Sequence, residues 1–189
     1  IDPFCSIPTL SMTGNAMIID TPENRPLPQY PRNIIRAAVE SMKALGVADT
    51  MLILPEFEFY LFDQVGWEVS GREISASVDA VQSYWNSATE GLGVVVPKQK
   101  NYHIAKPFDI SYECRSEMCM HMKDAGVEIN YHHPEVAASG QFEIEPQLGE
   151  VVHMADATMN IKYIIHNTAL KYGKTATFMP KPIYGEAGS

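Results

Sequence analysis

The sequence has few cysteines and no long apolar run, and both absences narrow the class of protein. Only Cys5, Cys114 and Cys119 occur, an odd number without metal-ligand spacing, which favours reduced thiols over a disulfide framework. No stretch reaches the apolar length that crosses a bilayer, and the N-terminus shows neither a basic region nor a hydrophobic signal core. We therefore predict a cytoplasmic protein.

Positive charge is also scarce. The 14 Lys and Arg residues stand against 23 Asp and Glu, and the formal charge of −9 argues against a nucleic-acid backbone as partner. An acidic balance is compatible with cation binding. The chain opens without Met and closes on a loop-like run after Tyr184, so we expect it to be a piece of a longer protein.

Hydrophobic periodicity predicts alternating helices and strands. Apolar residues at three-to-four spacing predict helices over 32–45, about 110–125 and about 154–171. Alternating patterns predict strands over 16–19, 51–62, 127–132, 141–145 and 175–178. The strands at 127–132 and 141–145 should form an antiparallel pair. The signal weakens from 63 to 101, where we expect a long, partly ordered excursion.

The run from Leu54 to Phe62 alternates carboxylates with aromatic residues. Successive side chains of a strand point to opposite faces, so Glu56 and Glu58 share one face, opposite Phe57 and Phe59. Neighbouring carboxylates repel, and cations, strong hydrogen bonds or a shared proton usually hold them. Mg²⁺ and Mn²⁺ are candidates because they prefer oxygen ligands. The alternative is an exposed edge strand whose Glu residues face water.

Two further carboxylates lie on either side of a predicted turn. Glu135 precedes the Ser139-Gly140 turn and Glu143 follows it, so the hairpin can bring them close together. With Glu56 and Glu58 they make the kind of cluster that a Mg²⁺ or Mn²⁺ site for phosphoryl transfer requires.

Histidine and tyrosine side chains leave alternatives open. His132 and His133 sit between strand and turn, where a histidine pair is more often a hydrogen-bonding element, but near a metal-phosphate site His could donate to a phosphoryl group. Tyr102 lies near two lysines and is either a packed ring or a substrate hydroxyl contact, of which packing is favoured.

Together these motifs resemble class I glutamine synthetase. Pro55–Phe59 looks like its first acidic strand, and His132–Ala137 and Gly140–Ile144 look like its HHEVA and GQxE elements. Arg115–Cys119 and Tyr172–Pro182 also fit, in matching order and spacing. The resemblance implies an α+β fold, with a curved, mostly antiparallel sheet that carries acidic residues and helices packed on its outer face.

The resemblance also implies metal ligands. Glu58, Glu135 and Glu143 match the three carboxylates of the metal site that engages glutamate. Glu56 matches a ligand of the second, ATP-side metal, whose other ligands lie beyond Ser189 in the family. Two or more Mg²⁺ or Mn²⁺ ions per site are therefore expected.

Other positions match contacts to substrate and nucleotide. His133 corresponds to a histidine near the transferred phosphate, Tyr102 to the glutamate and ammonium region, and Gly188 to the loop that holds glutamate. Asn130 and Leu148 match nucleotide-binding positions, although many members have Glu where Asn130 stands.

The implied reaction joins ammonia to the γ-carboxylate of L-glutamate through γ-glutamyl phosphate, with ATP as substrate. Members of the family form stacked double rings of six subunits, so a homo-dodecamer is expected. Residues 1–189 would be the N-terminal part of the catalytic domain, without the β-grasp domain and the later part of the catalytic domain. The isolated chain is therefore expected to be inactive.

Departures from the family pattern motivate two alternatives. Ala187 stands where many members have Asn, and Pro134 interrupts the histidine motif. With Asn130 they suggest a γ-glutamyl-polyamine or related amide ligase. A non-catalytic relative that assembles with or regulates a synthetase is the second alternative, and the intact carboxylate cluster counts against it.

Overall fold

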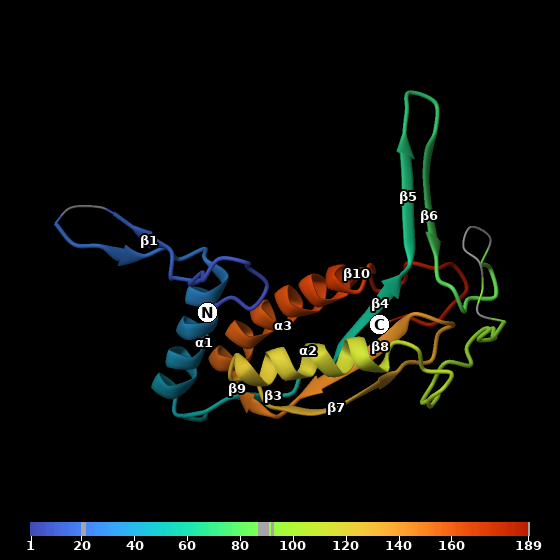
Figure 1. Ribbon diagram of the computed structural model, residues 1–189. Helices are drawn as coiled ribbons and strands as arrows, with labels where there is room; N and C mark the ends of the chain where they lie inside the picture. The colour runs from blue at the N-terminus through green and yellow to red at the C-terminus, as the bar shows by residue number, and fades with distance from the viewer. Residues whose placement is uncertain (20–21, 87–90, 92, 189) are drawn as a thin grey trace. The chain divides into compact units, whose positions relative to one another are not determined.

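A computed structural model describes residues 1–19, 22–86, 91 and 93–188 (Figure 1). The chain forms two compact units, one made of residues 1–55 and 148–160 and the other of residues 56–147 and 161–189. Within the described residues, no helix combines the length and the apolar character needed to cross a membrane.

The first unit contains helix α1 (Pro31–Ala44), which confirms the predicted helix over 32–45. Pro31 occupies the first helical turn, where the missing N–H costs nothing. Short antiparallel strand pairs accompany the helix. They are β1 (Met17–Ile18) with β2 (Arg25–Pro26), and β3 (Leu52–Ile53) with β9 (Gly149–Glu150). The β-rich run predicted over 51–62 is interrupted at residues 54–56. It forms β3 and a separate strand of the second unit, and Glu56 lies outside both strands.

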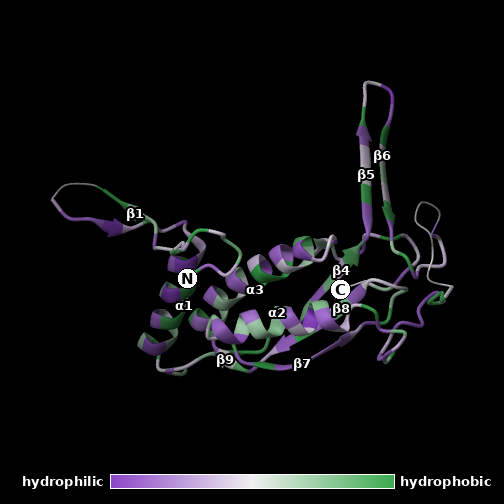
Figure 2. Cartoon of the chain, in the orientation of Figure 1, coloured by the Kyte–Doolittle hydropathy of each residue, from purple (hydrophilic) through white to green (hydrophobic). Residues whose placement is uncertain are grey.

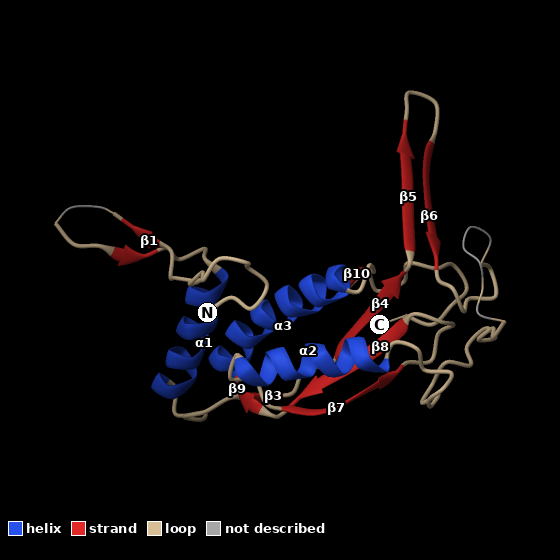
Figure 3. Cartoon of the chain, in the orientation of Figure 1, coloured by secondary structure: helices blue, strands red, loops and turns tan. Residues whose placement is uncertain are grey.

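In the second unit, described strands form an antiparallel four-stranded sheet in the order β10-β4-β8-β7 (Figures 1 and 3). Their bounds are β4 (Phe57–Phe62), β7 (Ile129–Pro134), β8 (Gln141–Pro146) and β10 (Thr175–Thr177). The predicted pairing of the strands near 127–132 and 141–145 is confirmed as β7 with β8. Strand β7 extends past the predicted end at 132, so His133 lies within the strand together with His132.

Helices cover the apolar face of this sheet, as the sequence predicted. Helix α2 (Tyr112–Asp124) contacts β7, and its Arg115 guanidinium lies 4.4 Å from the centre of the Phe142 ring. Helix α3 (Val151–Lys171) contributes His166, whose ring lies 5.4 Å from that of Phe178. Phe178 in turn lies 5.8 Å from Phe59 of β4. The face of the run that carries Phe59 is therefore the one packed beneath the helices.

The excursion predicted after residue 63 contains a regular hairpin, made of β5 (Gln64–Val69) and β6 (Ile74–Asp79). Directly opposed residues share a face, so the pairs Val65/Val78, Trp67/Ala76 and Val69/Ile74 form one apolar face. Trp67 is 77% exposed and Ile74 82% exposed. Figure 2 shows hydrophobic and hydrophilic residues interspersed along both strands. Residues 87–90 and 92 of the predicted excursion lie outside the described residues.

Candidate metal centre

A row of polar side chains crosses the face of the sheet opposite the helices. Glu58 of β4 lies directly opposite Glu143 of β8, and Glu143 lies directly opposite His133 of β7. Because opposed residues share a face, the three side chains point to the same side. Glu143, in the middle of the row, is only 7% exposed. Strand register therefore gathers residues that are far apart in the sequence.

Potential ligand atoms form two sets within the described residues. One set consists of His133, Glu135 and Glu143, and the other of Glu56, Glu143 and Glu145; in each, the atoms lie within 4.8 Å of one another. His133 Nδ1 is 3.6 Å from a Glu135 oxygen, and His133 Nε2 is 3.5 Å from a Glu143 oxygen. Glu135 and Glu143 lie in the same set, which confirms that the turn brings them together, and Glu143 belongs to both sets.

The carboxyl group of Glu143 has an unusual proton affinity. Burial first, and then the neighbouring charges of Glu56 and Glu135, raise its pKa to about 7. Without a cation, Glu143 therefore binds a proton more readily than an ordinary glutamate does. A divalent ion would displace that proton, because a metal ligand must be deprotonated.

Glu145 behaves in the opposite way. The Tyr131 hydroxyl donates to one of its carboxylate oxygens and the Asn130 amide to the other, and these bonds hold the pKa of Glu145 below its ordinary value. The same contact raises the pKa of Tyr131 to about 12. Asn130, predicted at a nucleotide position, thus bonds a carboxylate of the second ligand set.

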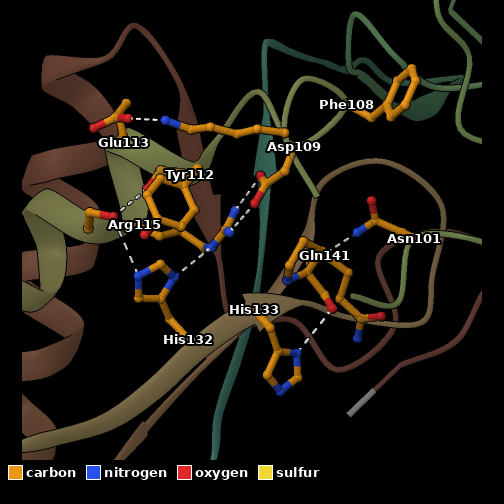
Figure 4. A network of polar contacts seen from close by, with 12 residues as sticks. Asn101, Phe108, Asp109, Tyr112, Glu113, Arg115, His132, His133 and Gln141 are labelled. Atoms are coloured by element: carbon orange, nitrogen blue, oxygen red, sulfur yellow. Dashed lines mark hydrogen bonds and ion pairs between the residues drawn. The ribbon is translucent and has the colours of Figure 1, made fainter. Parts of the chain in front are cut away.

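Gln141 braces the cluster from within β8. Its amide Nε2 donates to Glu58 Oε2 at 3.0 Å, and its Oε1 accepts from the Ala137 N–H at 2.9 Å. The Asn101 amide donates to the Gln141 carbonyl oxygen at 2.9 Å (Figure 4). Glu58 is therefore held in one orientation, as the supporting shell of a metal site requires.

The two histidines of β7 belong to different environments. Figure 4 shows His132 pointing toward Arg115 and His133 away from it. Arg115 forms a paired contact with Asp109 at 2.9 and 2.6 Å, and its Nε lies 3.3 Å from His132 Nδ1. Burial and the Arg115 charge lower the pKa of His132. Only His133 therefore shares the acidic face, which separates the roles that the sequence left open.

The remaining predicted residues have distinct surroundings. Tyr102 packs its ring edge-on against His133 at 5.5 Å and is more than half exposed. A Cβ added to Gly188 would lie 2.2 Å from the Pro180 carbonyl oxygen, so only glycine fits that position. Leu148 belongs to the first unit and is 57% exposed.

Sequence reasoning missed three residues of the centre. Glu145 and Gln141 occupy the same alternating positions of β8 as Glu143, so the period of the strand could have identified them. Tyr131 lies opposite Glu145 because the register between β7 and β8 shifts between Ile129 and Tyr131. The sequence carries no signal for this shift.

A comparison with protein families finds a family model that matches most of the chain. The model of the family described as "Glutamine synthetase, catalytic domain" matches residues 28–189. The chain belongs to this family.

The individual relatives are longer than this chain. The glutamine synthetase of Pasteurella multocida is 39% identical over 193 residues, which cover 100% of this chain and 40% of that protein. The 3-hydroxylaminophenol mutase of Cupriavidus pinatubonensis is 38% identical and is covered to 41%. The chain thus spans about 40% of the length of these curated relatives.

A solved structure shares the fold. The cryo-EM structure of Plasmodium falciparum glutamine synthetase superposes with a TM-score of 0.78 at 24% identity, over 92% of this chain and 37% of that chain. The α+β architecture with its antiparallel sheet and helices is therefore that of the glutamine synthetase catalytic domain.

Proposed function

We propose that the full-length protein ligates ammonia to the γ-carboxylate of L-glutamate through γ-glutamyl phosphate, converting ATP to ADP and phosphate. The observation that carries this proposal is the central position of Glu143, between Glu58 and His133 on one sheet face and within reach of Glu135. Membership of the glutamine synthetase family supports the choice of reaction.

The donor atoms fit a hard divalent cation. Carboxylate oxygens dominate both ligand sets, and Mg²⁺ and Mn²⁺ prefer such oxygens. In the proposal Glu58, which lies outside both ligand sets but directly opposite Glu143, joins Glu135 and Glu143 around one ion, and Glu56 contributes to a second. Bound ions would supply neutralisation of phosphate oxygens during the transfer.

The chain's own residues have complementary roles. His133, between Glu135 and Glu143, can donate a hydrogen bond to an oxygen of the transferred phosphoryl group. Tyr102 borders the glutamate and ammonium region, and Gly188 lets the backbone approach glutamate closely. Asn130 and Leu148 are proposed nucleotide contacts, although Asn130 would have to reach the nucleotide while bonded to Glu145.

The proposal includes assembly into a homo-oligomer of two stacked six-membered rings. The apolar face of hairpin β5–β6 supports contact with a second copy, because it exposes Trp67, Val69 and Ile74 side by side. Contiguous exposed apolar side chains commonly mark protein interfaces. A cytoplasmic location remains a prediction of the sequence.

A different amine acceptor is the second candidate. The methyl group of Ala187 packs against the apolar cluster of Tyr60, Phe62 and Ala137, so its side chain offers no hydrogen bond in the proposed glutamate loop. Alanine in place of the family's Asn therefore favours a change in which amine or amino acid the enzyme accepts. Relatives at 38–39% identity include a 3-hydroxylaminophenol mutase as well as glutamine synthetases, so this level of identity spans more than one reaction.

The test is ADP release by the full-length protein with Mg²⁺ or Mn²⁺, ATP and glutamate, comparing ammonium with a panel of amines. Glu58→Gln should abolish turnover, whereas Glu68→Gln, the same change on the exposed face of β5, should leave it intact. Turnover with another amine alone would select the sister ligase. Absence of turnover with every acceptor, in a protein that binds Mn²⁺, would overturn both candidates.

A further inference from the structure

Tyr60 is the next side chain after Glu58 on the face that carries the row of Glu58, Glu143 and His133. It follows Glu58 by two positions on β4 and therefore shares its face. Its ring is 1% exposed and stacks on Phe62 at 5.6 Å. The hydroxyl donates to the carbonyl oxygen of Ala187 at 2.5 Å.

Glu186 fixes the same segment at a second point. Its carboxylate is 1% exposed, which is costly unless both oxygens find donors. One oxygen accepts from the Tyr84 hydroxyl at 2.7 Å and the other from the Ala138 N–H at 3.1 Å. Loop 185–188 is thus bonded to three separate parts of the second unit. The Glu186 side chain bonds Tyr84 and Ala138, and the Ala187 carbonyl oxygen bonds Tyr60.

The hydrogen bond from the Ala138 N–H to Glu186 connects the loop to the acidic row. The turn that offers the Ala138 N–H also offers the Ala137 N–H, which donates to Gln141. Gln141 in turn donates to Glu58. Adjacent backbone amides of one turn therefore support both Glu58, through Gln141, and loop 185–188, through Glu186.

We infer that Tyr60 and Glu186 form a clamp that positions loop 185–188, and with it Gly188, against the acidic face for glutamate binding. The inference rests on the proposed function, because that proposal makes Gly188 a glutamate contact. Tyr60 and Glu186 act through the loop and are positioning residues. Tyr60 lies in the alternating run from Leu54 to Phe62, but the sequence assigned it no role. Its hydroxyl makes the hydrogen bond to the loop, and its apolar cluster contacts the Ala187 methyl group.

The experiment compares full-length wild type with Tyr60→Phe, which keeps the packed ring and removes only the hydroxyl. Tyr184→Phe is the matched control, because this nearby tyrosine is fully exposed. Loss of one net hydrogen bond predicts an increase of about fivefold in the KM for glutamate, with kcat within about twofold. Hydrogen–deuterium exchange of peptides covering 136–139 and 183–188 is measured alongside, since it needs no turnover.

The outcomes separate the clamp from the proposed function. A raised KM with faster exchange in both peptides, absent from Tyr184→Phe, supports the clamp. Faster exchange without glutamate-dependent turnover even in wild type supports the clamp and overturns the proposed function. Unchanged KM and exchange in Tyr60→Phe overturns the clamp, and so does an equal fall in kcat and thermal stability with KM unchanged. Glu186→Gln, which removes the buried charge, should raise the KM further if the clamp is correct.

Discussion

The four-stranded sheet and the β5–β6 hairpin share antiparallel geometry but differ in what covers their apolar faces. Phe59 and Phe142 of the sheet lie within the packed side, where Arg115 of α2 and Phe178 make ring contacts. In the hairpin, Trp67 and Ile74 are exposed. A two-stranded ribbon cannot bury a face by itself. Alternation therefore assigns residues to faces, whereas burial depends on a partner that alternation does not specify.

Removing part of the helical cover should have the largest effect on stability. Arg115→Leu leaves Asp109 buried without the guanidinium that pairs with it and removes the contact above Phe142. Breaking a buried ion pair in this way costs about 3–5 kcal/mol. Urea unfolding measures the loss. Lys123→Leu removes an exposed cation from the same helix and should change stability by less than about 0.5 kcal/mol; equal losses would show that burial of the pair is irrelevant.

A matched pair of isoleucines tests the comparison directly. Ile144 in the sheet is fully buried and Ile74 in the hairpin is 82% exposed. Ile144→Ala should lower the free energy of unfolding by about 2–5 kcal/mol, because it leaves a cavity. Ile74→Ala should change it by no more than about 0.5 kcal/mol. Thermal unfolding of both variants decides, and similar losses would mean that the hairpin face is covered in solution.

The acidic face should respond to pH. The pKa of Glu143 rises from 4.5 to about 7 on folding, so the folded state holds this proton more tightly than the unfolded state. Its stabilising contribution is full below about pH 4.5 and is lost as pH rises through about 7. The metal-free protein should thus lose stability from pH 5 to 7, by at most about 1.4 kcal/mol per pH unit for this group.

Variants and metal define the source of that slope. Glu143→Gln, which cannot ionise, should flatten the decline in unfolding free energy, whereas Glu68→Gln on the hairpin should preserve it. Added Mn²⁺ should stabilise wild type more at pH 7 than at pH 5, because binding requires the carboxylate form. A slope that persists in Glu143→Gln would assign the titration to another group.

The smallest effect on the stability of the chain is expected from a change of Trp67 in the β5–β6 hairpin. Trp67→Ser makes the hairpin face polar without disturbing a packed core, so the free energy of unfolding should change by less than about 0.5 kcal/mol. Sedimentation of the full-length protein should instead show a shift toward smaller assemblies. Unchanged assembly would exclude Trp67 from the contacts between subunits.

Local patterns predicted much of the fold and part of the site. Three-to-four spacing located α1 and α3. Alternation predicted that the side chains of Glu58 and Phe59 point to opposite faces of β4. The hairpin escaped prediction because its strands contain serine and glycine and have no buried partner to impose a long apolar run. The break between β3 and β4 also escaped, since an apolar run does not reveal that two strands join different sheets.

The sequence by itself determined which side chains share a face and which motifs carry acidic residues, because side-chain alternation is fixed by the backbone of each strand. Only the tertiary structure decided that His133 and not His132 joins Glu143, since this depends on the register between β7 and β8. It also decided that Tyr60 meets Ala187, a contact between residues 127 positions apart. Such approaches follow from the packing of the whole unit, whose free energy no local pattern contains.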